Sequence, residues 1–173
     1  MPVNWAAALT ELQNSKPNHD YSQVFKNIST SNEYDAFERG HLARHDFLFY
    51  LRECFGWDAD RHDDDLMALW NSCLSHTFAE LDPLLGELST RYTLATLSNT
   101  NPMHFETFSS FPSFRHFRYL FTSVGFGCRK PEPEIYRKAA AALSLPPQEI
   151  LFVDDLQANV IGAQSVGFHA EQV

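Results

Sequence analysis

The chain has 173 residues, of which 44% are hydrophobic and 20% charged, and its formal net charge at pH 7 is -9. A chain of this length forms one domain, with or without an inserted sub-domain, and a composition close to the globular average excludes disorder, collagen-like repeats and low complexity. The acidic balance argues against a nucleic-acid partner, and no apolar run approaches the roughly 18 residues of a membrane helix, so we expect neither nucleic acid nor membrane as a partner.

Targeting signals and cysteine usage both favour a reducing compartment. The segment from Met1 to Trp5 has neither the basic region nor the apolar region of a secretion signal. The three cysteines, Cys54, Cys73 and Cys128, are odd in number and form no CxxC pair. We therefore expect a cytoplasmic protein with buried free thiols.

The first half of the chain is predicted to be helical. Apolar spacing and capping residues indicate helices over residues 5–13, 21–28, 33–38, 44–55 and 63–78. The last of these opens with three aspartates, residues 63–65, which we interpret as a solvated helix start because consecutive helical residues do not converge on a metal. A histidine pair, His41 and His45, has zinc-ligand spacing, but no third ligand is evident and we expect both on the surface.

The second half alternates short apolar strands with helices, which is typical of a parallel α/β sheet. The pattern predicts strands over residues 92–97, 119–124, 150–153 and 168–173, and helices over residues 134–143 and 159–166. Between the first two strands a phenylalanine recurs at every third position: Phe105, Phe108, Phe111, Phe114 and Phe117. We interpret this series as a linker helix packed on the sheet, with a ligand groove as the alternative.

Polar residues gather just beyond two strand ends, where open α/β sheets bind their ligands. Ser98 and Asn99 follow the first strand in a turn whose hydroxyl and backbone N–H groups can hold phosphate oxygens. Lys130, in a Lys-Pro pair that opens a helix, can supply a cation to a transferring phosphoryl group. Asp154 and Asp155 end the third strand, and because successive strand residues face opposite ways we expect one to ligate Mg²⁺ and the other to orient Lys130.

Taken in order, these motifs resemble those of the haloacid dehalogenase-like (HAD) hydrolases. Residues 97–101, 127–136 and 153–163 are similar to the second, third and fourth motifs of that family. Within the family, the sequence is most similar to the sugar-phosphate phosphatase branch, such as glucose-1-phosphate phosphatases. The similarity includes a Glu-Arg-Gly turn at residues 38–40.

The resemblance implies the fold and the phosphate site. Residues 81–173 would form a Rossmann-like parallel sheet with helices on both faces, and residues 1–80 would form a helical cap. Ser98, Asn99 and Lys130 would bind the phosphate group of a small phosphorylated metabolite, and Lys130 would also act in catalysis by stabilising charge.

The resemblance also implies a magnesium cofactor. Asp154 would ligate Mg²⁺, and Asp155 and Asn159 would support the metal and the lysine. Related phosphatases often carry a histidine at the position of His104, which would reach the substrate, although we favour the alternative of a solvated loop.

One feature of the family is missing from these 173 residues. Members open with an apolar strand that ends in an aspartate nucleophile. Here the first helix is expected to start at about Asn4, so only three residues precede it, and a core strand needs about five. The first carboxylate, Glu11, and the first aspartate, Asp20, do not follow a strand. Without the nucleophile, covalent phosphoryl transfer has no first step, so we expect this chain to be inactive. An upstream strand with Asp-x-Gly or Asp-x-Asp, or a carboxylate from elsewhere in the pocket, would overturn that expectation.

The missing strand would lie at the centre of the sheet, between the strands that end at Ser98 and Asp154. Its absence leaves unpaired backbone groups, so either these two strands pair directly or another segment lies between them. A second copy of the chain is one source of that segment, which predicts a homodimer. Three hypotheses follow: a Mg²⁺-dependent phosphatase of small phosphomonoesters that lacks its nucleophile strand, a non-catalytic HAD-fold binding module with a phosphate and magnesium pocket, and a dimeric structural protein.

Overall fold

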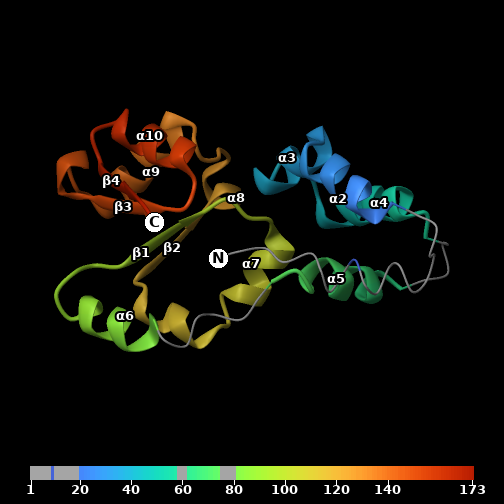
Figure 1. Cartoon of the computed structure of the whole chain (residues 1–173), viewed down its shortest axis with the longest axis horizontal. Helices are drawn as coiled ribbons and strands as arrows, with labels where there is room; N and C mark the ends of the chain where they lie inside the picture. The colour runs from blue at the N-terminus through green and yellow to red at the C-terminus, as the bar shows by residue number, and fades with distance from the viewer. Residues whose placement is uncertain (1–8, 10–19, 58–61, 75–80) are drawn as a thin grey trace.

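The computed structural model describes residues 9, 20–57, 62–74 and 81–173. The helix predicted over residues 5–13 lies outside the described residues except at Leu9, which is helical. Figure 1 shows the helices of the first half on one side of the molecule and the strands on the other. No helix in the described part of the chain combines the length and apolar character that a bilayer-spanning segment needs.

The four other helices expected in the first half are present. They are α2 (Tyr21–Ser29), α3 (Asn32–Glu38), α4 (Arg44–Phe55) and α5 (Asp63–Asn71). The Asp20 and Ser31 side chains cap α2 and α3 by accepting hydrogen bonds from main-chain N–H groups, and Gly56 ends α4 in the left-handed conformation. The prediction for α5 was too long, because the helix ends at Asn71, and residues 75–78 lie outside the described residues.

Aromatic packing holds these helices together. Phe37 and Phe47 stack with ring centroids 4.1 Å apart, and the ring of Trp70 meets that of Phe47 edge-on at 5.3 Å. Met103, from the second half of the chain, is buried in the same cluster. This packing fixes α3 and α5 against the segment that follows the first strand.

The second half contains the predicted alternation of strands and helices. Its elements are α6 (Leu81–Ser89), β1 (Ala95–Ser98), α7 (Pro102–Phe108), η1 (Pro112–His116), β2 (Tyr119–Thr122), α8 (Ser123–Phe126), α9 (Pro133–Leu143), η2 (Pro147–Glu149), β3 (Leu151–Asp154), α10 (Gln157–Gln164) and β4 (His169–Gln172). The strand predicted over residues 119–124 ends early because the Thr122 hydroxyl accepts a hydrogen bond from the Gly125 N–H and starts α8. The helix α6 was not predicted.

The strands form two separate parallel pairs. β1 pairs with β2, and β3 pairs with β4, each over four residues in register. Among the described residues β1 and β3 do not pair with each other, so the first of the two arrangements expected for the sheet centre is not adopted. Leu151 and Val153 of β3 are exposed by 66% and 50%, which leaves an apolar strip on the strand facing away from α9.

A second hydrophobic cluster packs α9 and α10 on β3 and β4. Tyr136 lies at its centre, edge-on to the rings of Phe152 and Phe168 at 5.4 and 5.9 Å. Gly162 of α10 permits the closest approach, because a Cβ there would lie 2.5 Å from the Pro131 carbonyl oxygen. The segment before α9 therefore packs closely against α10, and this contact positions the neighbouring Lys130 at the edge of the sheet.

The linker between β1 and β2 is not one helix. Pro112 opens the short helix η1 after α7 has ended at Phe108, and the phenylalanines pack in pairs, with the Phe108 and Phe114 ring centroids 5.2 Å apart. The surface predictions hold, because His41, His45 and residues 63–65 are exposed. The three cysteines are free thiols, of which Cys54 is only partly buried.

Candidate functional site

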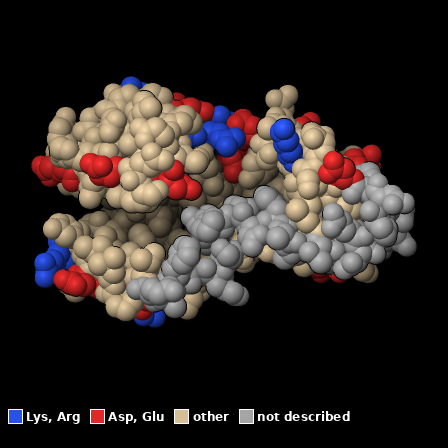
Figure 2. Space-filling view, viewed as in Figure 1, with Lys and Arg blue, Asp and Glu red and all other residues tan. Residues whose placement is uncertain are grey.

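A cavity of about 680 Å³ opens between the two strand pairs and the first-half helices. Its walls come from both sheets: Thr96, Leu97 and Ser98 of β1, and Val153 and Asp154 of β3. Figure 2 shows the surface hollowed between the part that carries β3 and β4 and the part that carries β1 and β2. The cavity therefore lies at the carboxyl ends of parallel strands, where the sequence predicted a ligand site.

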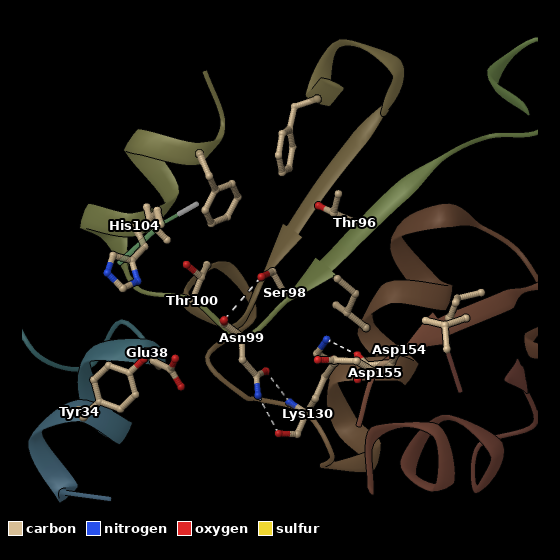
Figure 3. A pocket seen from close by; sticks show the side chains of 16 residues that line it. Tyr34, Glu38, Thr96, Ser98, Asn99, Thr100, His104, Lys130, Asp154 and Asp155 are labelled. Atoms are coloured by element: carbon tan, nitrogen blue, oxygen red, sulfur yellow. Dashed lines mark hydrogen bonds and ion pairs between the residues drawn. The ribbon is translucent and has the colours of Figure 1, made fainter. Parts of the chain in front are cut away.

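Asn99 fixes the main chain of Lys130 from across the cavity. The Asn99 side chain accepts a hydrogen bond from the Lys130 N–H at 2.8 Å and donates one to the Lys130 carbonyl oxygen at 2.9 Å (Figure 3). Both polar groups of the Asn99 amide are engaged there. The helix expected to open at the Lys-Pro pair begins later, because Glu132 occupies its N-cap and Pro133 its first turn.

Lys130 and Asp154 form a largely buried ion pair at the end of β3. Lys130 Nζ lies 2.6 Å from Asp154 Oδ2, and the Leu156 N–H and Asn159 Nδ2 donate to Asp154 Oδ1 at 2.9 and 2.8 Å. Burial alone would raise the pKa of Asp154, but these donors outweigh it and hold the pKa below its ordinary value. One carboxylate of the pair was expected to orient the lysine, and that carboxylate is Asp154, whereas the resemblance implied Asp155.

Asp155 lies beside this pair with a different environment. Its side chain lines the cavity and is exposed to solvent. Among the described residues Asp154 Oδ2 receives one donor, and because an ionised carboxylate oxygen has two lone pairs it can accept a second bond. No cluster of three or more His, Cys, Asp or Glu side chains able to hold a metal occurs among the described residues.

The turn after β1 offers further polar groups. The Ser98 hydroxyl lines the cavity and makes a long contact of 3.5 Å to the Asn99 carbonyl oxygen. Thr100 is buried, and Ser123 of α8 binds its N–H and its carbonyl oxygen, both at 3.0 Å. The hydrogen bonds from α8 therefore fix the turn on its buried side, while the Ser98 hydroxyl faces the cavity.

The opposite wall of the cavity comes from α3. Tyr34 and Glu38 line it, and Figure 3 shows the Glu38 carboxylate on the side facing Asn99 and Lys130. Glu38 is 4% exposed, and burial raises its pKa although Arg129 opposes the rise. From the sequence, Glu38 belongs to a turn that resembles the family, but no role could be predicted for it. Helical spacing alone does not show whether a side chain faces a cavity.

Ion pairs join α3 to the segment that carries Lys130. Arg129 Nη1 lies 3.0 Å from Asp35 Oδ1, and the Arg39 guanidinium donates two hydrogen bonds to Glu132, at 2.5 and 3.0 Å. Asp35 also accepts from Arg39 Nε at 2.7 Å. These contacts hold the two walls of the cavity at a fixed separation.

His104 is buried, so the solvated loop expected for it was wrong. It lies in α7 with 5% exposure, and its ring stacks on Trp70 at 5.4 Å. Asn101 Nδ2 lies 3.1 Å from Nδ1, while the Trp70 carbonyl oxygen and Cys73 Sγ lie 3.3 and 3.5 Å from Nε2. Burial lowers the pKa of His104 to about 4, which keeps the ring neutral at physiological pH.

The comparisons with known proteins agree with this architecture. A family model described as haloacid dehalogenase-like hydrolase matches residues 6–167, which is most of the chain. Among curated proteins, bifunctional epoxide hydrolase 2 of Rattus norvegicus is 38% identical over 53 residues, and acyl-CoA dehydrogenase family member 10 of Mus musculus is 35% identical over 82 residues. These matches cover 31% and 46% of this chain but only 10% and 8% of those proteins.

Solved structures of similar fold cover nearly the whole chain. A HAD family enzyme from Bacteroides thetaiotaomicron, in complex with magnesium and inorganic phosphate, has a TM-score of 0.85 at 22% identity over 99% of this chain and 87% of that one. L-2-haloacid dehalogenase from Xanthobacter autotrophicus, with chloropropionic acid covalently bound, has a TM-score of 0.69 at 20% identity over 100% of this chain and 73% of that one. At these identities the likeness shows the fold alone.

Proposed function

Because this chain belongs to the haloacid dehalogenase-like hydrolases, we propose that its cavity binds the phosphate group of a small phosphomonoester together with Mg²⁺. The observation that supports this most directly is the placement of Lys130. Its main chain is held by Asn99 at the end of β1, and its ammonium group is held by Asp154 at the end of β3. A cation fixed between two strand ends, in a cavity, is preorganised for an anionic ligand.

The charges that line the cavity indicate why a metal is needed. Lys130 is opposed there by Asp154 and Asp155, while Glu38 is paired with Arg129, so the lining carries a surplus of negative charge that repels a phosphate dianion. A divalent cation reverses that balance, and Mg²⁺ is commonly bound by one or two carboxylates together with substrate phosphate oxygens and water. Asp154, through the second acceptor position of Oδ2, and Asp155 would hold Mg²⁺, which supplies charge neutralisation at the phosphate.

The remaining residues of the chain position the phosphate. The Ser98 hydroxyl donates to a phosphate oxygen, and the main-chain N–H of Asn99 serves the same purpose because the Asn99 side chain is engaged by Lys130. Asn159 keeps Asp154 oriented by donating to Oδ1. The ligand in this account is a small phosphorylated metabolite.

We propose that this chain binds phosphoesters without turning them over. The aspartates that line the cavity are Asp154, which is engaged by Lys130, and Asp155, which follows the same strand end. Asp20, the first aspartate of the sequence, caps α2 instead. Glu38 is a carboxylate from elsewhere in the polypeptide that lines the cavity, but Arg129 neutralises it on the wall opposite Lys130.

Binding and turnover are tested separately on the 173-residue chain. Calorimetric titration with inorganic phosphate in the presence of Mg²⁺ should show binding that Lys130→Ala weakens by about tenfold to a hundredfold, the range for a hydrogen bond to a charged group. The matched control is Lys138→Ala, because Lys138 pairs with Glu134 outside the cavity. Mg²⁺ binding should weaken in Asp154→Ala, and unchanged binding would remove Asp154 as a ligand.

The turnover assay uses p-nitrophenyl phosphate with Mg²⁺. The expected result is no release of nitrophenol above the uncatalysed rate, because the reacting carboxylate of the covalent mechanism is not among the cavity residues described above. Robust turnover that Lys130→Ala abolishes would show that the chain is an active phosphatase and would contradict this part of the proposal.

A second candidate, a homodimer completed at the sheet centre, is favoured by the two separate strand pairs. Leu151 and Val153 expose apolar surface on β3, and an extended segment of a second copy placed beside β1 or β3 would cover it and pair the strand edge. Sedimentation velocity at micromolar concentration should show a dimer, which Val153→Lys weakens. A chain that sediments as a monomer at all concentrations would exclude this candidate.

A further inference from the structure

The turn that carries Lys130 is tied to α3 at both of its ends. The Glu132 N–H donates a hydrogen bond to the Arg129 carbonyl oxygen at 2.9 Å and closes the turn. At the start of the turn, Arg129 Nη1 lies 3.0 Å from Asp35 Oδ1 on α3. At its end, Glu132 accepts two hydrogen bonds from Arg39, the C-cap residue of α3. Lys130 therefore lies between two ion pairs that both lead to the same helix.

Asp35 joins these two ion pairs into one network. Arg39 Nε lies 2.7 Å from Asp35 Oδ2, while Arg129 contacts the other oxygen of the same carboxylate. Hydrogen bonds from Arg39 are the main reason that the pKa values of Asp35 and Glu132 lie below their ordinary values, so both carboxylates are charged at neutral pH. Figure 2 shows basic and acidic side chains next to one another where the first-half helices meet the part that carries β3 and β4. A two-pronged contact between a guanidinium and a carboxylate fixes direction as well as distance, so Arg39 holds the end of the turn in one orientation.

The cavity side of the turn depends on that orientation. The Lys130 N–H donates to Asn99 Oδ1 at 2.8 Å, and the Lys130 ammonium group lies 2.6 Å from Asp154 Oδ2. A displacement of about 1 Å would take either hydrogen bond out of range. The position of the cation therefore rests on three elements: β1, β3 and, through the turn, α3.

We propose that Arg39 is a positioning residue for the phosphate site, because it holds Glu132 and thereby the turn that presents Lys130. For its ligand, this inference rests on the proposed function. Arg39 and Glu132 are not among the described residues that line the cavity, so their effect reaches the phosphate through Lys130 and not by contact. Phosphate affinity should then depend on a first-half residue that does not touch the phosphate.

A double-mutant cycle tests whether Arg39 acts through Lys130. Inorganic phosphate is titrated in the presence of Mg²⁺ into the wild type, Arg39→Ala, Lys130→Ala and the double variant. Arg39→Ala should weaken phosphate binding about fivefold when Lys130 is present, and by less than about twofold in the Lys130→Ala background. A role in general stability would instead change the affinity equally in both backgrounds.

The matched control is Arg44→Ala. Arg44 on α4 pairs with Glu106 on α7, so it also joins the first half of the chain to the second half, and neither residue is among the described cavity residues. This exposed ion pair has no connection to the turn, and its loss should change phosphate affinity by less than about twofold. Thermal unfolding of both arginine variants checks that each retains the fold.

A second measurement observes the turn without any ligand. Amide hydrogen exchange, followed by NMR, reports how often the Lys130 N–H leaves Asn99. Arg39→Ala should raise the exchange rate of this amide about tenfold, whereas Arg44→Ala should leave it unchanged. Arg39→Lys keeps the charge but not the two-pronged contact, so its exchange rate should lie between those of the wild type and Arg39→Ala. This milder variant also tests the proposal if Arg39→Ala does not fold.

The outcomes separate this inference from the proposed function. Equal effects of Arg39→Ala in the two backgrounds, or an unchanged exchange rate of the Lys130 amide, would overturn the positioning role. Phosphate binding that still depended on Lys130 would leave the proposed function intact in that case. Failure of inorganic phosphate to bind the wild type would overturn the proposed function, and the exchange measurement would still decide whether Arg39 holds the turn.

Discussion

His104 should make the protein sensitive to mild acid. Its ring stacks on Trp70, and the Asn101 amide nitrogen lies 3.1 Å from Nδ1, so the neutral ring accepts at Nδ1 and keeps its proton on Nε2, toward the Trp70 carbonyl oxygen. Protonation at Nδ1 would set that N–H against the Asn101 N–H group in a buried place. The folded state therefore resists protonation, whereas the unfolded chain does not.

The size of the effect follows from the displaced pKa. Burial lowers the pKa of His104 from 6.5 to about 4. Between those values the unfolded chain binds the proton that the folded chain refuses, so the free energy of unfolding falls as the pH falls. At about 1.4 kcal/mol per pH unit, His104 should remove about 2 kcal/mol of stability between pH 7 and pH 5. The loss is complete only below pH 4, where the folded state also takes up the proton.

Urea unfolding at a series of pH values measures this contribution. His104→Gln removes the titrating ring, so the difference in unfolding free energy between wild type and variant should shrink by about 2 kcal/mol from pH 7 to pH 5. His45→Gln is the control for replacing a histidine by glutamine, because His45 is exposed on α4 and distant from the Trp70 contact. Parallel curves for wild type and His104→Gln would refute the reasoning.

Two further predictions concern packing and thiol reactivity. Gly162→Ala should destabilise the protein by about 1 to 3 kcal/mol and weaken phosphate binding, because the added Cβ would press on the Pro131 carbonyl oxygen beside Lys130. The control in thermal unfolding is Gly86→Ala, where an added Cβ would have its nearest contact at 3.4 Å. Equal melting temperatures for the two variants would contradict the prediction. Burial raises the pKa of the Cys73 thiol to about 12. A disulfide reagent at pH 7.5 should therefore leave Cys73 unlabelled in the native protein and label it after unfolding in guanidinium. Rapid labelling of Cys73 in the native protein would contradict its burial.

Strand ends and motif residues were predictable because short-range patterns determine them. Ser98, Asn99 and Asp154 follow apolar strands, and parallel strands bring their carboxyl ends to one edge, so the proximity of these residues to Lys130 could be expected before any coordinates. The carboxylate that pairs with the Lys130 ammonium group could not be predicted. Alternation along a strand shows that Asp154 and Asp155 point apart, but it does not show which of the two faces the segment before α9.

Helix ends and linkers were less predictable for local reasons. The β2 strand stops at Thr122 because one hydroxyl caps the next turn, a choice that apolar periodicity does not reveal. Likewise, Pro112 divides the phenylalanine series between two short helices, and only then do Phe108 and Phe114 turn toward the cavity. Those two rings pack on each other and also line the cavity, while the ligand-groove interpretation of the series stays a prediction.

The least predictable residues are those whose burial depends on packing between the two halves of the chain. Glu38 and His104 are separated by 66 positions in the sequence, and each becomes buried only because α3 and α5 pack on the segment after β1. A glutamate at a helix end and a histidine after a turn are usually solvated, so a local interpretation assigns both to the surface. Their burial requires compensation from the rest of the structure, by Arg129 for Glu38 and by Asn101 and the Trp70 carbonyl for His104. The compensating groups come from positions distant in the sequence, 91 residues away for Glu38 and 34 residues away for the Trp70 carbonyl at His104, so no local pattern could indicate them.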